Sequence, residues 1–155
     1  MKNTKISVLI SFFNAEKYIY NSLNSITSQT YNNIEILLID DGSKDDSLKI
    51  VNSFKDERIS IFKNLNNKGL NFSINKLIDK ATGEYIAIMD ADDVASKYRI
   101  ERQLIFLKKN KLDVCGTSLN FFGSFKNYKQ TKLKEDKDIK LLMTFGNPMA
   151  NPSIL

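Results

Sequence analysis

Short apolar runs alternate along the chain with segments whose apolar residues recur at helical spacing. Residues 5–11, 34–39, 58–64 and 85–89 form four such runs, rich in β-branched residues and of strand length. A strand with one wet face would alternate apolar and polar positions, whereas most of these runs are nearly continuous. The pattern therefore predicts a mostly parallel sheet that helices cover on both faces.

Each run is followed by a segment with the periodicity of an amphipathic helix. In residues 14–30, the side chains of Ala15, Ile19, Leu23 and Ile26 share one helical face. The same kind of pattern is found in residues 43–54, 70–81 and 95–110. The resulting order, strand and helix in alternation, predicts the α/β class.

Local signals add detail to this order. Ser43 and Asp46 have the spacing of a capping box, so Ser43 is predicted to cap the second helix. Residues 112–123 predict a further strand, and the lysine-rich segment 125–138 predicts a surface loop. The apolar residues 153–155 are typical of the beginning of another strand.

Length and composition restrict the class of protein. A chain of 155 residues is about one domain with one sizeable core, so residues 1–155 are expected to form a single domain. The longest apolar runs are far shorter than the roughly 18 residues that span a bilayer, and no signal peptide precedes Ile6. We therefore expect a cytoplasmic protein.

The cysteine and histidine content and the net charge restrict which disulfides, metal sites and partners this chain can have. Cys115 is the single cysteine, so no internal disulfide can form. The sequence contains no histidine, so any metal is expected to be bound by oxygen atoms. The net charge of +5 comes from scattered lysines, which favours a solvated surface over attraction to anionic substrates or a membrane. We expect no nucleic-acid partner.

Two of the predicted strands end in acidic residues. Asp40 and Asp41 close the second run, and Asp90, Asp92 and Asp93 close the fourth. Turn chemistry alone could explain the first pair, and a solvated helix N-terminus could explain the second group. Neither explains why both groups follow strands. Because parallel α/β sheets bind ligands at the carboxyl ends of their strands, the two groups should meet at one edge.

Carboxylates in this arrangement suit Mg²⁺ or Mn²⁺. These ions are held by one or two carboxylates, and substrate phosphates complete their coordination. Two acids one residue apart can divide the work, one binding the ion and the other accepting a hydrogen bond from a sugar hydroxyl. The ion would neutralise the charge that develops on a diphosphate leaving group.

Several stretches of this chain together resemble a known family. They are "SVLISFFNAEKYIYNSLNSITSQTYNNIEILLIDDGSKDDS", "NKGLNFSIN", "GEYIAIMDADD", "RIERQ" and "NPMANPS". They resemble the N-terminal, donor-binding part of a glycosyltransferase family 2 enzyme with the Rossmann-like GT-A fold. The resemblance implies an inverting, metal-dependent transfer of sugar from a nucleotide diphosphate sugar, with a UDP-sugar favoured. It further implies a glycan or lipid-linked acceptor and a role in bacterial capsule or lipopolysaccharide synthesis.

The resemblance also implies roles for individual residues. In the DxD-like triplet, Asp92 would be the metal ligand and the catalytic residue, and Asp90 would contact the donor ribose or phosphates, with Asp93 beside it on the substrate. Asp41 falls where the family binds the nucleotide base, commonly uracil. The remaining donor contacts would come from Ser11, on the end of the first strand, and from Lys68.

This sequence departs from the family pattern at three positions. Ser11 stands where many members carry proline, and Ile74 stands where many carry arginine, so Lys68 would have to supply that charged contact. Asn151 stands where related sequences often carry histidine. The family's catalytic base normally lies beyond the position of Leu155, so we expect a chain truncated on its acceptor side. Peripheral association with the inner face of the cell membrane is compatible with such a role.

Two other classes of protein deserve comparison. A phospho-receiver signalling module also binds Mg²⁺ with an acid pair, but it carries that pair after its first strand, whereas a complete strand–helix unit precedes Asp40. A sugar nucleotidyltransferase would need a glycine-rich phosphate loop after the first strand, and "SFFNAEKY" contains no glycine. Both classes remain as alternatives to a glycosyltransferase at this point.

Overall fold

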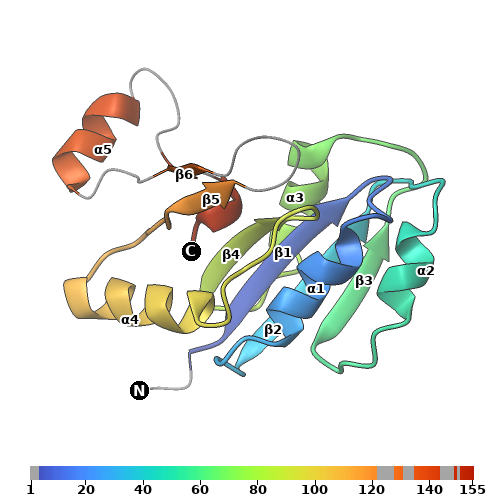
Figure 1. The fold of residues 1–155 in the computed structure, drawn as a ribbon, viewed down its shortest axis with the longest axis horizontal. Coiled ribbons are helices and arrows are strands. Elements are labelled where there is room, and N and C mark those ends of the chain that lie inside the picture. Colours follow the sequence, from blue (N-terminus) through green and yellow to red (C-terminus); the bar gives the residue numbers. More distant parts are fainter. Residues whose placement is uncertain (1–3, 122–127, 131–134, 144–148, 150) are drawn as a thin grey trace.

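A four-stranded parallel sheet forms the centre of the molecule (Figure 1). The computed structural model describes residues 4–121, 128–130, 135–143, 149 and 151–155. The strands are β1 (Ile6–Phe12), β2 (Ile34–Asp40), β3 (Ile59–Lys63) and β4 (Tyr85–Asp90). They lie in the order β3-β2-β1-β4, and every pair is parallel. The predicted α/β fold with a mostly parallel sheet is confirmed.

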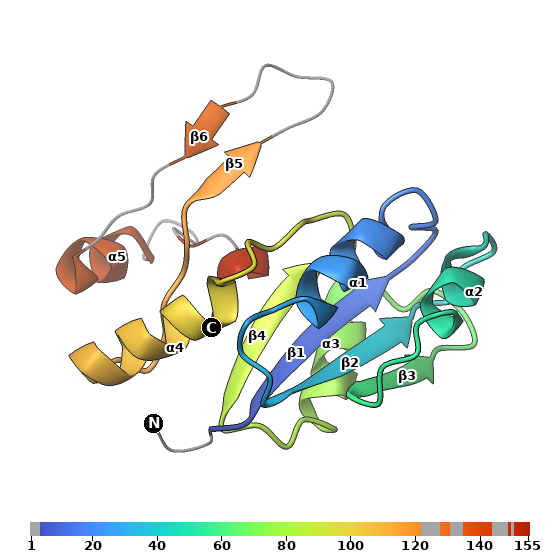
Figure 2. The same cartoon turned by 60° about the horizontal axis from the view of Figure 1, so that its bottom comes forward.

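Helices cover both faces of this sheet. Those on one face are α1 (Ile19–Thr27), α2 (Ser47–Asn52) and α4 (Arg99–Asn110), and α3 (Leu70–Ile78) lies on the other (Figures 1 and 2). No helix within the described ranges is long and apolar enough to cross a membrane.

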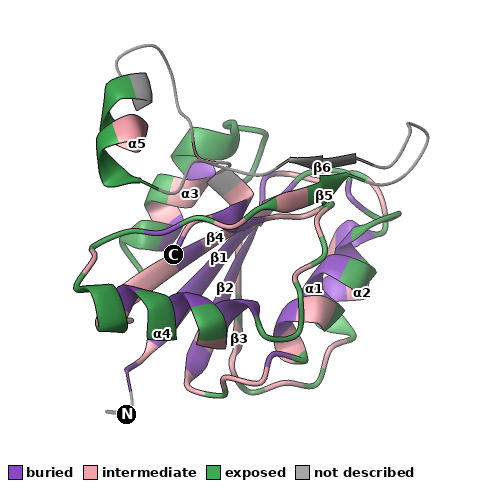
Figure 3. Cartoon of the chain, turned by 60° about the vertical axis from the view of Figure 1, so that its left-hand side comes forward, coloured by how far each residue is buried: buried purple, intermediate pink, exposed green. Residues whose placement is uncertain are grey.

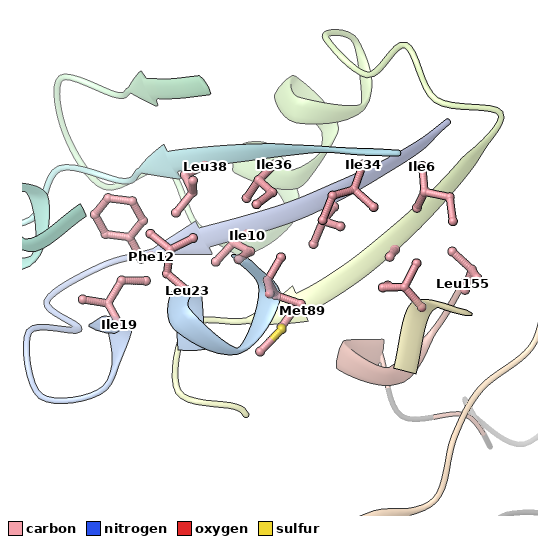
Figure 4. Packing of buried hydrophobic residues seen from close by; sticks show 14 of the residues in the cluster. Ile6, Ile10, Phe12, Ile19, Leu23, Ile34, Ile36, Leu38, Met89 and Leu155 are labelled. Atoms are coloured by element: carbon pink, nitrogen blue, oxygen red, sulfur yellow. The ribbon is translucent and has the colours of Figure 1, made fainter. Parts of the chain in front are cut away.

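The core follows from the alternation of side chains along β1. Val8, Ile10 and Phe12 point into a large cluster with α1, where Ile19, Leu23 and Ile26 of the predicted face are buried (Figures 3 and 4). Ala15, predicted on the same face, is buried too but precedes the helix. Leu9 points the opposite way and packs with Leu77 of α3. Because β1 is buried on both faces, its sequence reads as an almost continuous apolar run.

The prediction that Ser43 caps α2 is wrong. The helix begins at Ser47, and the hydroxyl of Ser43 instead accepts a hydrogen bond from the backbone N–H of Asn14, at 3.0 Å. At the start of α2, Asp45 Oδ1 accepts a hydrogen bond from the Ser47 N–H, at 3.0 Å. Ser43 therefore connects two loops that are 29 residues apart in the sequence, and it does not cap a helix.

The C-terminal third departs from the predicted elements. Its strands are β5 (Leu119–Phe121) and β6 (Tyr128–Gln130), which pair antiparallel, and its helices are α5 (Asp136–Met143) and the 3-10 turn η1 (Asn151–Ser153). The strand predicted over 112–123 is thus reduced to β5. The loop predicted over 125–138 contains β6 and the start of α5, and its other residues lie largely outside the described ones.

Residues 153–155 lie along the outer edge of β4. The N–H of Ile88 donates a hydrogen bond to the carbonyl of Ile154, at 3.2 Å, and Leu155 exchanges two backbone hydrogen bonds of 2.9 Å with Cys115. Leu155 also joins the core cluster (Figure 4). The segment predicted to begin a strand therefore pairs with the sheet edge, although it is not itself a regular strand.

A partly exposed ion pair lies at the opposite end of the sheet, at the amino ends of the strands. The ammonium of Lys5 lies 2.7 Å from Glu35 Oε2, and the Thr82 N–H donates to Glu35 Oε1, also at 2.7 Å. Burial alone would raise the pKa of Glu35, but hydrogen bonds from Lys5, Ser7 and Thr82 outweigh it and lower the pKa to about 2.

We expect Glu35→Gln to lower the free energy of unfolding by about 2 kcal/mol at pH 7. This is less than the full pKa shift implies, because the Lys5 side chain is 42% exposed and screened by water. A depressed pKa stabilises the fold above the ordinary value of 4.5, and the contribution is lost as the pH falls towards 2. Urea unfolding at pH 7 and pH 4 should show that the difference in free energy of unfolding between the wild type and Glu35→Gln is smaller at pH 4. The exposed Glu57→Gln is the control, and a difference that does not change with pH would contradict the assignment.

Candidate functional site

The strand register brings the acidic residues of β2 and β4 to one edge of the sheet. Phe12, the last residue of β1, is aligned with Asp40 of β2, and its neighbour Ser11 is aligned with Asp90 of β4. All three strands run in the same direction, so their carboxyl ends lie together (Figure 1). Ser11 is half-buried between the two acidic groups. The candidate site therefore lies at the edge where parallel α/β sheets bind ligands.

Asp41 follows β2 and is almost fully buried. Its Oδ1 accepts hydrogen bonds from Asn64 Nδ2 at 2.8 Å and from the Lys68 N–H at 2.9 Å, and its Oδ2 accepts one from the Gly69 N–H at 2.8 Å. Burial would raise the pKa of Asp41, but these bonds together with Ser73 lower it below its ordinary value. A carboxylate has about four acceptor positions, and the donors of Asn64, Lys68 and Gly69 take three of them.

The loop that carries Lys68 lies directly against the turn after β2. Gly42 has φ of +83°, and a Cβ atom there would lie 2.9 Å from the backbone carbon of Asn66. Only glycine fits this turn without strain. The backbone N–H of Lys68 binds Asp41, while its side chain is exposed. Ile74, within α3, packs partly buried against the smaller core cluster, and Lys68 is an exposed cation of the loop before α3.

Asp40 differs from its neighbour because its carboxylate is enclosed. It has no exposed surface, and its Oδ1 accepts a hydrogen bond from the Ser43 N–H at 2.7 Å. Among the described residues, Asp40 Oδ2 is the buried side-chain atom that lacks a partner. Asp40 therefore shapes the turn, whereas Asp41 binds the loop that carries Lys68.

The acids after β4 interact with one another electrostatically. Burial raises the pKa of Asp90, and the charges of Asp93 and Asp92 raise it further. Burial and the charge of Asp92 likewise raise the pKa of Asp93, against the opposing effect of Arg99. Asp92 is exposed. Like charges this close make a cation favourable at the cluster, because it would stabilise their ionised forms.

The chemistry of these donors fits a divalent ion held by few protein ligands. The described residues contain no group of three or more acidic, histidine or cysteine side chains poised around one ion. One or two carboxylates of the Asp90–Asp93 cluster can still bind Mg²⁺ or Mn²⁺ when phosphate oxygens supply the other positions. The exposed Asp92 is the acid most open to such an ion.

Sequence reasoning missed the part of the edge formed by α4. Arg99 is only 8% exposed, and its Nε and Nη2 donate to Gln103 Oε1 at 3.0 Å and to the Ile88 carbonyl at 2.9 Å. Gln103 Nε2 in turn donates to the Ser153 carbonyl at 2.8 Å. The "RIERQ" stretch carried the signal, because residues four apart share one helical face. Asn151 lies in η1 beside this region, and its side chain is outside the described residues.

Comparison with known proteins identifies sequences that are similar to this chain. The model of the family described as Glycosyl transferase family 2 matches residues 7–152. The chain is 35% identical to UDP-Glc:alpha-D-GlcNAc-diphosphoundecaprenol beta-1,3-glucosyltransferase WfaP of Escherichia coli, covering 92% of this chain and 51% of WfaP. It is 30% identical to O-antigen biosynthesis glycosyltransferase WbnJ of Escherichia coli, covering 97% of this chain and 60% of WbnJ.

The fold has a close match among solved structures. The crystal structure of Staphylococcus aureus TarS 1–349 in complex with UDP-GlcNAc superposes with a TM-score of 0.76 at 27% identity. This match covers 84% of the present chain and 38% of TarS. The present chain spans about half the length of the relatives it matches. The family match leaves no support for the receiver module or the nucleotidyltransferase.

Proposed function

The chain belongs to glycosyltransferase family 2, and we propose that it transfers a sugar, with inversion, from a nucleotide diphosphate sugar to a glycan or lipid-linked acceptor. Similarity to WfaP and WbnJ supports a role in bacterial surface polysaccharide synthesis. The cytoplasmic face of the membrane is the location that we propose for it. The likeness to a UDP-GlcNAc complex of TarS supports a UDP-sugar as the donor.

The acidic edge of the sheet carries this proposal. Asp41 offers one acceptor position for an N–H of the base, beside the half-buried Ser11. Asp90, aligned with Ser11 on the other side of β1, would accept a hydrogen bond from the ribose or face the phosphates, and the exposed Lys68 would contact the diphosphate. These four residues would bind and orient the donor.

Asp92 and Asp93 would act at the bond that breaks, between the donor sugar and the diphosphate. Asp92 would hold Mn²⁺ or Mg²⁺ and in this sense is the catalytic residue, and Asp93 would face the donor sugar. When bound, the ion supplies positive charge that stabilises the departing diphosphate. No proton needs to reach that leaving group, because a nucleoside diphosphate leaves as an anion.

We expect UDP to bind more tightly than GDP or dTDP, and at least tenfold more tightly with Mn²⁺ than without it. The reason is that diphosphate oxygens and the Asp90–Asp93 carboxylates repel one another unless a cation lies between them. Isothermal titration calorimetry of the three nucleotides, in Mn²⁺ and in chelator, measures both effects. Absence of binding by every nucleotide in Mn²⁺ would refute the proposed donor site.

A further inference from the structure

A cavity of about 540 Å³ lies next to the acidic cluster, and the donor contacts proposed above leave it largely unused. Its walls are the β4–α4 connection, the first turns of α4, residues 117–121 and residues 152–153. The ribbon of Figure 2 shows these segments gathered on the side of β4 away from β2. The volume is within the range of about 300–1,000 Å³ that is usual for small-molecule sites.

The charges on the cavity wall sum to a positive value. Its ionisable lining residues are Asp93, Arg99 and Arg102, one anion and two cations. Burial lowers the pKa of Arg99 to about 10, with Asp93 acting against the shift, so the guanidinium remains protonated at neutral pH. An anion in the cavity would therefore meet a net attraction.

One nitrogen of the Arg99 guanidinium is not used by the hydrogen bonds within the described residues. The Nε and Nη2 of Arg99 are occupied by Gln103 and by the carbonyls of Ile88 and Ile154. Its Nη1 has no hydrogen-bond partner among the described residues. Asp40 Oδ2 is the single side-chain atom of those residues that is both fully buried and unpaired, so Arg99 Nη1 keeps some accessible surface. Arg99 is 92% buried and lines the cavity, so we take Nη1 as the end of its guanidinium that can donate to a ligand there.

Arg102 presents a second guanidinium three residues later on α4. It lies over the ring of Tyr98, 5.2 Å from the ring centroid. Within the described chain its side chain makes no hydrogen bond or ion pair, and it is exposed. Stacking on a ring fixes the plane of a guanidinium while leaving its N–H groups free to bind a phosphate with two hydrogen bonds.

Part of the lining is apolar. It comprises Met89, Val94, Leu119 and Phe121. Val94 and Phe121 are 52% and 37% exposed, which is high for apolar side chains beside a polar site. The cavity thus combines two cations with an apolar surface, which suits an anionic group joined to an apolar chain.

We propose that this cavity binds the phosphate of an acceptor in which a phosphate or diphosphate joins a sugar to an apolar chain. Arg102 and Arg99 Nη1 hold the phosphate, and the apolar lining contacts the first carbons of the chain. The inference rests on the proposed glycosyl transfer, because it names the acceptor class of that same site. Asp93, which lines this cavity, would then lie between the donor sugar and the acceptor sugar.

Farnesyl diphosphate is the probe, titrated calorimetrically into the full chain in the presence of chelator, so that no metal ion can draw the diphosphate to the acidic cluster. We expect measurable binding to the wild type and at least a tenfold loss in Arg102→Gln. The matched control is Lys109→Gln, which removes the same charge from an exposed position on the same helix, outside the cavity. We expect less than a twofold change in this variant.

Two further ligands distinguish the sources of binding energy. Inorganic diphosphate should bind more weakly than farnesyl diphosphate, and farnesol should bind more weakly still. Equal binding of inorganic diphosphate would reduce the cavity to a free-phosphate site, and equal binding of farnesol would remove any role for the arginines. Either of these results would overturn the inference. So would a wild type that does not bind farnesyl diphosphate, or an equal loss of affinity for it in Arg102→Gln and Lys109→Gln.

The donor function and the acceptor inference can fail separately. UDP binding is measured with Mn²⁺ and depends on Asp41 and Asp92, whereas farnesyl diphosphate binding is measured without metal and depends on Arg102. Loss of UDP binding alone would refute the proposed donor site. Normal UDP binding without farnesyl diphosphate binding would refute the acceptor inference alone.

Discussion

Asp92→Asn is expected to remove most of the Mn²⁺ enhancement of UDP binding, which means a loss of tenfold or more in affinity when Mn²⁺ is present. Asp92 is the exposed acid of a cluster in which burial and neighbouring charges raise the pKa of both Asp90 and Asp93, and the charge of Asp92 contributes to both shifts. An amide is a weaker ligand than a carboxylate for a hard divalent cation. Replacing Asp92 also removes a charge that raises the pKa of both neighbours, so the variant has less need of an ion.

The fold should survive this change. The Asp92 carboxylate accepts no hydrogen bond within the described residues, so its stability effect should stay within about 0.5 kcal/mol. Asp113→Asn is a suitable control, because Asp113 is an exposed acid just beyond α4 and makes no ion pair in the described chain. Calorimetry in Mn²⁺ and in chelator, with thermal unfolding in parallel, gives the comparison. Unchanged metal dependence in Asp92→Asn would show that another acid holds the ion.

The parts of the fold that the sequence predicted are those set by local periodicity. β1 and β2 read as apolar runs because both of their faces are buried. The helical face that begins at Ile19 was visible because residues at spacings of three and four meet the same sheet surface. The meeting of Asp40 and Asp90 at one edge then followed, since parallel strands share the direction of their carboxyl ends.

Contacts between distant loops could not be predicted in this way. Ser43 and Asp46 matched a local capping pattern, but the hydroxyl of Ser43 accepts a hydrogen bond from the N–H of Asn14, on another loop. Asp41 likewise takes its donors from residues 64–69, and no periodicity links these positions. Local patterns describe a segment by itself, whereas hydrogen bonds between loops depend on how the sheet brings those loops together.

The cavity beside β4 was missed for a related reason. Arg99 and Gln103 are separated by one helical turn, and the sequence places them on one face of α4. Their partners at residues 115 and 153–154 come from parts of the chain whose predicted strands did not form as expected. A binding surface built from three separate segments becomes visible only when the fold is known.

Asp41→Ala is expected to weaken UDP binding by about a hundredfold and to lower the free energy of unfolding by about 3 kcal/mol. The change removes the acceptor for three donors, from Asn64, Lys68 and Gly69, and leaves them in a buried or half-buried place. It also removes the acceptor position proposed for the base. Inorganic diphosphate lacks a base, so its binding with Mn²⁺ should fall much less than that of UDP.

Asn64→Ala separates recognition of the base from support of the loop. This variant removes a buried amide that donates to Asp41 at 2.8 Å and to Ser73 at 2.9 Å, but it leaves the carboxylate and both backbone donors in place. It should therefore lose stability, whereas its UDP affinity should fall by less than fivefold. Calorimetry with UDP and with inorganic diphosphate on both variants, beside urea unfolding, makes the comparison complete. If Asn64→Ala weakened UDP as strongly as Asp41→Ala, or if Asp41→Ala weakened both ligands equally, Asp41 would act by holding residues 64–69 and not by binding the base.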